Sequence, residues 1–306
     1  MDALKVVVIG GGVIGLSTAY QLAKRKACHV TLIEKDAIGD GASRRAAGII
    51  TDLLWTKTGV ETRQRSLQLY AELTRDLDGY QFQRCGCLNL FDVQGWAERV
   101  DLLSLYAATN TAYEILKPHE MRARWPDLNW SDAWVGLYDP VGGYSEPDAY
   151  IPALVRRVAA LGVDIREHAH AQDLHLEQDR VAGVVVDGQL IEADAVVVTV
   201  HAWTASLLTR YGLRFPVKTF VHQRYLSASM SIPADMPAIN ANPLDGYVRP
   251  AAGSRLLVGV ETARRAEARV DDAAFHMDLL SSPPGLAGAL HAVFANFVPG
   301  LASLPW

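Results

Sequence analysis

The feature that most constrains this chain is a glycine-rich run at residues 10–15, Gly-Gly-Gly-Val-Ile-Gly, placed directly after residues 5–9, Lys-Val-Val-Val-Ile. An unbroken β-branched run bounded by glycine is typical of a parallel strand that is covered on both faces. Residues 13–26 then carry a helical pattern, and residues 30–34 have the pattern of a second apolar strand. The start of the chain therefore predicts a βαβ unit.

The glycine run fits the spacing G-x-G-x-x-G. Gly10 allows a tight turn, Gly12 lets the backbone approach a pyrophosphate, and Gly15 permits close packing of the helix against the strand. The first helical residues, Val13 and Ile14, contribute unpaired N–H groups and the positive end of the helix dipole. This arrangement predicts a site for the phosphates of a dinucleotide.

Glu34 ends the second strand of the unit, about 20 residues after the glycine run. A carboxylate at this place can accept hydrogen bonds from both hydroxyls of an adenosine ribose, and it repels a 2′-phosphate. NADP is therefore disfavoured. NAD and FAD remain open on these residues alone.

Composition excludes several other classes of protein. Half of the 306 residues are hydrophobic, 21% are charged and the net charge is -5, which is typical of a globule and not of a disordered chain, a collagen or a coiled coil. A slightly acidic chain also gives no electrostatic reason to expect nucleic acid as a partner.

The cysteines and histidines give no sign of a metal site or a disulfide framework. Cys85 and Cys87 have no second cysteine pair to complete a zinc site, Cys28 stands alone, and the nine histidines show no ligand spacing such as H-E-x-x-H. The start of the chain has no secretory pattern. We therefore expect no metal and a cytoplasmic location.

The remaining pattern predicts two domains that interrupt each other. Helices are expected at residues 62–77, 95–109, 152–161 and 284–297, and strands at residues 82–92, 133–139, 163–167, 181–186, 189–191, 195–200, 217–228, 246–249 and 255–260. The fold class is α/β: a discontinuous Rossmann-type domain over residues 1–80 and 141–215. Residues 81–140 and 216–306 are expected to form a second, substrate-binding domain of mixed antiparallel sheet, α+β in class, whose terminal helix leads back to the first domain.

Residues 39–50, Gly-Asp-Gly-Ala-Ser-Arg-Arg-Ala-Ala-Gly-Ile-Ile, resemble the loop that wraps the pyrophosphate and flavin ring in the D-amino acid oxidase superfamily. Residues 142–147 are similar to the family's return into its flavin domain, and residues 195–203 to a strand and turn that usually end Ala-Gly-Ala-Trp. Residues 216–223 resemble the branch that contains dimethylglycine dehydrogenase and the catalytic subunit of heteromeric sarcosine oxidase. These matches run through the chain in the family's order.

The resemblance implies FAD as the cofactor. The residues that it places against FAD are Gly10, Gly12, Val13, Ile14, Gly15, Glu34, Lys35, Ala42, Ser43, Arg44, Ala47, Gly48, Ala171 and Trp203. One position departs from the family, because His201 stands where the family has a glycine at the turn after the strand.

The resemblance is less informative about the substrate. Arg249 could offer a bidentate guanidinium fork to a substrate carboxylate, and an ion pair at the protein surface is an equal alternative. His201, His222 and Tyr225 are polar candidates on segments expected to border the flavin. Leu257 stands where one branch of sarcosine oxidases has the lysine that faces oxygen.

The implied activity is oxidation of an amine or α-amino acid, with hydride transfer from Cα to flavin N5. An N-methyl amino acid is the first choice of substrate, with glycine or a D-amino acid next, and O2 or an electron carrier is the acceptor. The alternatives are a non-catalytic or truncated FAD-binding subunit in a homo- or hetero-oligomer and, with less support, an NAD-dependent dehydrogenase. Because the family continues with a strand and a loop beyond the helix at 284–297, we also expect a chain that lacks the C-terminal segment.

Overall fold

The computed structural model describes residues 3–260, 267–270, 274–281 and 285–302. The chain divides into two compact units. The first contains residues 1–46, 147–221 and 266–281, and the second contains residues 47–146, 222–265 and 282–306. The first crossing therefore follows residue 46, where the sequence pattern had suggested residue 80.

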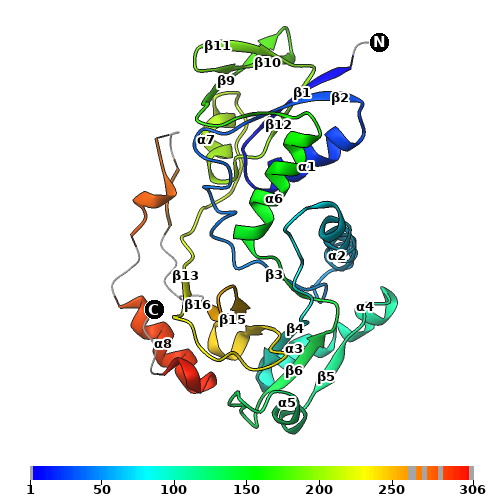
Figure 1. The fold of residues 1–306 in the computed structure, drawn as a ribbon, viewed down its shortest axis with the longest axis vertical. Helices are drawn as coiled ribbons and strands as arrows, with labels where there is room; N and C mark the ends of the chain where they lie inside the picture. The colour runs from blue at the N-terminus through cyan, green and yellow to red at the C-terminus, as the bar shows by residue number, and fades with distance from the viewer. Residues whose placement is uncertain (1–2, 261–266, 271–273, 282–284, 303–306) are drawn as a thin grey trace. The chain divides into compact units, whose positions relative to one another are not determined.

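The first unit is built on a parallel sheet of four strands in the order β12-β1-β2-β8 (Figure 1). These strands are Ala195–Val198, Leu4–Ile9, Cys28–Ile33 and Asp164–Arg166. Val6 of β1 pairs with Val30 of β2 on one side and Ala195 of β12 on the other. The predicted βαβ unit is therefore present, with β1 in the middle of the sheet.

Two helices of this unit, α1 (Val13–Lys24) and α6 (Pro147–Ala160), pack against each other (Figure 1). The second begins earlier than expected, because Pro147 and not Pro152 occupies its first turn. Pro147 suits that position, since the N–H that proline lacks has no intrahelical partner there. Pro152 lies inside the helix, where its ring nitrogen cannot donate to the carbonyl four residues earlier.

A three-stranded antiparallel sheet, β11-β10-β9, completes the first unit together with α7 (Thr204–Thr209). Its strands are Gln189–Glu192, Arg180–Val186 and Ala171–Glu177. The hairpin between β10 and β11 turns at Asp187 and Gly188, whose φ values of 47° and 79° are both positive, as a type I′ turn requires. Val184 and Val186 pack with Val7 and Ile9 of the parallel sheet.

The second unit contains a seven-stranded mixed sheet in the order β13-β16-β15-β14-β4-β6-β5. In that order the strands are Arg224–Leu226, Arg255–Val260, Gly246–Ala251, Ala238–Ala241, Cys87–Phe91, Val135–Asp139 and Glu114–Leu116. All neighbours are antiparallel except β14 and β4. A separate small ladder joins β3 (Ile49–Ile50) to β7 (Gly143–Tyr144). Of the strand expected at residues 217–228, only β13 forms.

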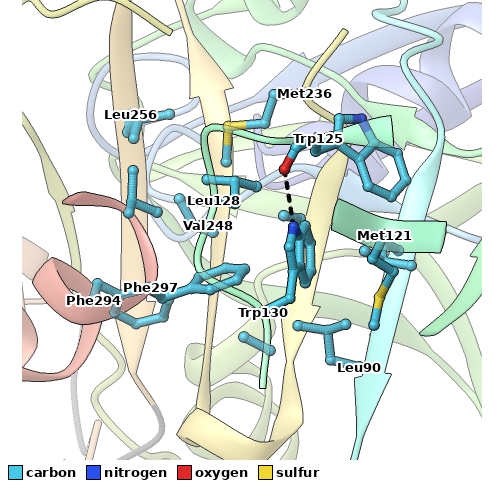
Figure 2. Packing of buried hydrophobic residues seen from close by; sticks show 14 of the residues in the cluster. Leu90, Met121, Trp125, Leu128, Trp130, Met236, Val248, Leu256, Phe294 and Phe297 are labelled. Carbon is cyan, nitrogen blue, oxygen red and sulfur yellow. Dashed lines mark hydrogen bonds between the residues drawn. The ribbon is translucent and has the colours of Figure 1, made fainter. Parts of the chain in front are cut away.

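Aromatic, aliphatic and methionine side chains pack together in the core of the second unit (Figure 2). Trp125 is 1% exposed, and its backbone carbonyl accepts a 2.9 Å hydrogen bond from the indole Nε1 of Trp130. Phe294 and Phe297 of α8 (Leu286–Phe297) pack into the same cluster. The terminal helix is therefore part of this core. Its expected start at residue 284 lies outside the described residues.

The helix α2 (Lys57–Asp76) belongs to the second unit, although the sequence pattern had assigned it to the first. Val60 on this helix is fully buried in a cluster with Phe91 of β4 and Tyr106 of α4. The unit also contains α3 (Val93–Val100), α4 (Leu103–Ala108) and α5 (Pro118–Arg124). In the described ranges no helix combines the length and the apolar character needed to cross a bilayer.

Candidate functional site

A cavity of about 630 Å³ lies in the first unit, at the carboxyl ends of its parallel strands. Ile9, Ile33 and Thr199, which end or follow β1, β2 and β12, line its floor. Ligands of open α/β sheets bind in the crevice at this edge. The volume is in the range of small-molecule and cofactor pockets.

The glycine turn at the cavity has no room for side chains at two positions. Gly10 has φ 106°, and a Cβ atom on Gly15 would lie 1.8 Å from the carbonyl oxygen of Gly10. Gly15 therefore lets α1 approach the turn, as its place in the motif predicts. Thr199 closes the other side, since its Oγ1 donates to the carbonyl of Ile9 across 2.8 Å.

The start of α1 is joined to the loop that follows β2. Gly12 precedes the helix, and the backbone N–H of Val13 donates to Oγ of Ser43 across 2.9 Å. Gly12, Val13 and Ser43 all line the cavity. The hydrogen bond thus places the predicted phosphate-binding turn and the predicted flavin loop in direct contact.

Glu34 is fixed by backbone donors and keeps capacity for a ligand. Its Oε2 accepts from the N–H of Gly11 at 2.8 Å, and its Oε1 accepts from the N–H of Asp36 at 3.0 Å. A carboxylate has about four acceptor sites, so each oxygen retains a lone pair. The Glu34 side chain can therefore accept hydroxyl donors from a ribose.

The segment expected at the adenine end is attached to the same strand end. The N–H of His168 donates to the carbonyl of Asp36 at 3.0 Å, and the N–H of Ala169 donates to that of Glu34 at 2.9 Å. Ala171 then opens β9 and lines the cavity. These backbone bonds explain how residues far apart in the sequence reach one cavity wall.

Trp203 contributes a polar atom that the described protein residues do not satisfy. Its indole Nε1 is buried and has no hydrogen-bond partner in the described ranges, while the ring lines the cavity. Nζ of Lys35 lies 5.1 Å from the ring centroid. A buried donor without an acceptor is costly. The site thus fits a ligand that presents an acceptor oxygen or nitrogen, and FAD carries many.

His201 occupies the position where the family has a glycine, and its backbone has the left-handed φ of 44°. The side chain is exposed at the cavity wall. Few residues other than glycine adopt this φ, although histidine does so more readily than most. The backbone conformation is therefore one that glycine would adopt without strain.

Arg249 lies in the second unit, on β15, and its side chain is completely buried. Its Nη1 and Nη2 donate to the two carboxylate oxygens of Glu146, at 3.0 and 3.3 Å. The bidentate fork that we expected to be open to a substrate carboxylate is therefore occupied by Glu146. Of the two alternatives left open by the sequence, the geometry corresponds to the ion pair, in a buried and not a surface position.

Tyr225 and His222 also lie in the second unit. Tyr225 is half-buried on β13, and its hydroxyl donates to Oε1 of Gln223 at 3.3 Å. His222 is exposed. In the described part of the chain, no group of three or more His, Cys, Asp or Glu side chains is arranged to hold a metal ion.

A family model described as DAO, FAD dependent oxidoreductase, matches residues 5–304. The chain belongs to this family. It is 31% identical over 265 residues to 4-methylaminobutanoate oxidase (formaldehyde-forming) of Paenarthrobacter nicotinovorans, covering 84% of this chain and 31% of the relative. It is 26% identical to sarcosine oxidase subunit beta of Arthrobacter sp, covering 83% of this chain and 64% of that subunit. The chain thus spans less than two thirds of these relatives' length.

The fold agrees with that of a solved structure. The crystal structure of L-proline dehydrogenase from P. horikoshii superposes with a TM-score of 0.88 at 20% identity, covering 99% of this chain and 79% of that one. The predicted superfamily, its two-part fold class and FAD as its cofactor are confirmed by these findings.

The cavity of the first unit contains most of the residues that the sequence placed against FAD. Those that line it are Gly10, Gly12, Val13, Ile14, Glu34, Lys35, Ala42, Ser43, Ala171 and Trp203. Gly15, Arg44, Ala47 and Gly48 are not among the described lining residues. Gly15 instead packs against the Gly10 carbonyl, and Ala47 and Gly48 belong to the second unit.

Several lining residues of the flavoprotein site were not identified from the sequence. They include Asp36, Gln172, Thr199, Ser206, Leu207 and Met277. Thr199 could have been found, because it follows a parallel strand at the edge where ligands bind. Met277 had no such signal, since residues 274–281 carry neither a motif nor a clear periodicity.

Proposed function

We propose that this chain binds FAD in the cavity of the first unit and oxidises an amine or amino acid. The observation that carries the proposal is the convergence, on one cavity, of a helix start, a ribose-type carboxylate and a buried donor without an acceptor. These are Val13, Glu34 and Trp203. Each one matches a different part of a dinucleotide.

The residues of the cavity would divide the cofactor between them. The start of α1 offers the positive end of its helix dipole to the pyrophosphate, while the N–H of Val13 itself donates to Ser43. Glu34 accepts the adenosine ribose hydroxyls with the acceptor sites that Gly11 and Asp36 leave over. Trp203 donates its indole N–H. Lys35 provides a positive charge beside the ring of Trp203.

An N-methyl amine that also carries a carboxylate is the substrate class that we favour. The names of 4-methylaminobutanoate oxidase and of sarcosine oxidase subunit beta both specify such a compound. Glycine and D-amino acids are our next choices of substrate. Arg249 supplies no open fork for the substrate carboxylate, because Glu146 holds it. His201, which is exposed at the cavity wall, remains our candidate for a polar contact with the substrate in the first unit.

FAD held by the residues of this cavity would supply the oxidation, as the acceptor of a hydride from the carbon attached to the amine nitrogen. The substrate's C–H bond would break as the nitrogen lone pair forms a C=N bond, and water would then hydrolyse the imine to an amine and an aldehyde or keto acid. The protein's part is to bind the amine neutral, to orient it and to exclude bulk water from the reacting atoms. No dedicated acid or base is required.

The remaining proposals concern the setting of the reaction. We propose O2 or an electron carrier as the acceptor, and a homo- or hetero-oligomer as the working form, since one relative is named as a subunit. A cytoplasmic location is in keeping with three free cysteines, Cys28, Cys85 and Cys87.

The decisive experiment is an anaerobic titration of the purified protein with sarcosine, dimethylglycine, 4-methylaminobutanoate, glycine and D-alanine. We expect a yellow protein whose absorbance near 450 nm, a wavelength set by the flavin, is lost with at least one of them. A yellow protein that none of them bleaches would indicate an FAD-binding subunit without this activity. A colourless protein whose Tm rises with NAD would refute the FAD proposal.

A further inference from the structure

Arg249 binds two segments of the second unit that are distant in sequence. While its Nη1 and Nη2 pair with Glu146, its Nε donates to the backbone carbonyl of Ala47 at 2.5 Å. Nη1 also donates to the carbonyl of Pro250 at 2.7 Å, and the guanidinium carbon lies 4.4 Å from the ring centroid of Tyr144. The guanidinium is thus held on all sides by protein groups.

The same two segments are also joined by their backbones. The N–H of Ser145 donates to the carbonyl of Gly48 at 2.9 Å, and Ile49 pairs with Tyr144 in the small ladder of β3 and β7. Gly48 has φ 72°, and a Cβ atom there would lie 2.2 Å from the carbonyl oxygen of Ser145. The backbone at Ala47 and Gly48 is therefore closely fixed by residues 144–146 and by Arg249.

The two segments lie at the ends of the stretch of chain, residues 47–146, that belongs to the second unit. Ala47 is the first residue of the second unit after the loop at residues 39–46, and Glu146 is the last before the chain enters α6. Ala42, Ser43 and Ala46 of that loop line the FAD cavity. Whatever fixes Ala47 therefore fixes the carboxyl end of the cofactor loop.

We propose that Arg249 and Glu146 form a clamp on the Ala47 carbonyl that positions the cofactor loop, so that Arg249 is a positioning residue for flavin and does not bind the substrate carboxylate. This inference rests on the proposed function in assigning the cavity to FAD. A loop that is already ordered loses less conformational entropy when the ligand binds, and this raises affinity. A buried bidentate ion pair provides that order with a defined geometry.

The test compares Glu146→Gln and Arg249→Lys with the control Arg99→Lys. The glutamine keeps the shape of the side chain and loses the charge, and the lysine cannot reach the Ala47 carbonyl and both carboxylate oxygens together. Arg99 is a buried arginine of the same unit, 7% exposed, that donates to the carbonyl of Leu53 and to the hydroxyl of Tyr106. The control thus removes a buried guanidinium without altering the clamp.

Two measurements are made on each variant. Hydrogen exchange of apoprotein should become faster in peptides that cover residues 47–50 and 143–146, in the two clamp variants and not in the control. The dissociation constant for added FAD should rise about tenfold in the clamp variants, with a change in the fine structure of the flavin absorption band. Because Glu146→Gln is a mild change, it provides the result if Arg249→Lys does not fold.

Three outcomes separate the possibilities. Unchanged exchange in both clamp variants would refute the clamp. The clamp would also be refuted if FAD affinity were unchanged and KM rose for amines that bear a carboxylate but not for amines without one. That result would indicate that Arg249 binds the substrate carboxylate. If the wild-type protein itself binds no FAD, the proposed function fails, and the exchange data still decide whether the clamp orders Ala47 and Gly48.

Discussion

Asp52 and Asp139 lie against each other inside the second unit, where the backbone N–H of Asp52 donates to Oδ2 of Asp139 across 3.1 Å. The two residues are 3% and 0% exposed. Asp139 also accepts hydrogen bonds from the hydroxyl of Thr51 and from the N–H groups of Val141 and Gly142. In contrast, Oδ1 of Asp52 is buried without a hydrogen-bond partner in the described part of the chain. Burial, followed by the charge of Asp139, raises the pKa of Asp52 to about 7.

This pair predicts a pH dependence of stability. The ordinary pKa of the Asp52 carboxyl is 3.8, so between about pH 4 and pH 7 the folded state binds one proton more than the unfolded state. The stabilisation is complete below pH 4 and is lost as the pH rises through 7. Relative to Asp52→Asn, the wild-type free energy of unfolding should fall by about 3 kcal/mol between pH 5 and pH 8.

Urea unfolding of the wild type and of Asp52→Asn at several pH values provides the measurement. Asp132→Asn, at a side chain that is 88% exposed, is the matched control. If the curves of the wild type and Asp52→Asn run parallel from pH 5 to pH 8, then the Asp52 carboxyl does not titrate in this interval.

The glycine turn allows a sharper test of the cofactor site. Gly15→Ala would place a Cβ atom 1.8 Å from the carbonyl of Gly10, so α1 or the turn must move. We expect a loss of about 3 kcal/mol in unfolding free energy and apoprotein after purification. Gly288→Ala is the control, because among the described residues no atom outside the local helix backbone lies within 4 Å of a Cβ there, and the residue is inside α8. It should stabilise by up to about 1 kcal/mol. Retention of flavin in Gly15→Ala would show that the turn tolerates displacement.

The βαβ unit and its ligand edge could be predicted from the sequence because each step is local. The strand, the three glycines and Glu34 lie within the first 34 residues, and a buried parallel strand and a phosphate-binding turn each impose a short pattern. The hairpin turn at Asp187 and Gly188 could also be predicted from a short pattern, since a type I′ turn needs two positive φ values that Asp-Gly tolerates.

Other features could not be predicted because they depend on partners distant in sequence. Strand β14, Ala238–Ala241, is a short Ala-Ile-Asn-Ala run that is defined by pairing with β4, about half the chain away. The role of Arg249 depends on Glu146, which is 103 positions earlier. The amphipathic sequence pattern of a helix such as α2 predicts which face is buried, but it does not predict which unit covers that face.

The variant Trp203→Phe should separate two effects of the buried indole N–H: its cost to the stability of the apoprotein and its contribution to FAD binding. The substitution keeps an aromatic ring against Phe275, whose centroid is 5.8 Å away, and removes the unsatisfied Nε1. The apoprotein should become more stable, by about 1 kcal/mol, since the desolvated N–H is gone. FAD binding should weaken by about tenfold, because the ligand loses one hydrogen bond in a dry cavity.

Chemical unfolding of apoprotein and a fluorescence titration with FAD measure the two effects of Trp203→Phe. Trp134→Phe, in the aromatic core of the second unit beside Phe297, is the control for removing an indole elsewhere. Equal FAD affinity in wild type and Trp203→Phe would mean that the indole N–H does not face the cofactor.

The last prediction concerns His201, which has a φ of 44° at the cavity wall. A left-handed backbone costs an ordinary residue about 1–2 kcal/mol, least for residues such as asparagine, aspartate and histidine and most for β-branched ones. His201→Gly should therefore be at least as stable as the wild type, with the relief of strain partly offset by the greater freedom of glycine in the unfolded chain. His201→Val should lose about 2 kcal/mol. His175→Val, on the half-buried strand β9, is the matched control and should be tolerated, since valine favours strands.

The same variants test the proposed place of the imidazole beside the flavin. If His201 contacts the substrate, His201→Gly should slow the anaerobic loss of absorbance near 450 nm although its fold is no less stable. An unchanged rate of absorbance loss in His201→Gly would show that the imidazole does not contact the substrate. A His201→Val variant that is as stable as His175→Val would show that the left-handed backbone is not required at residue 201.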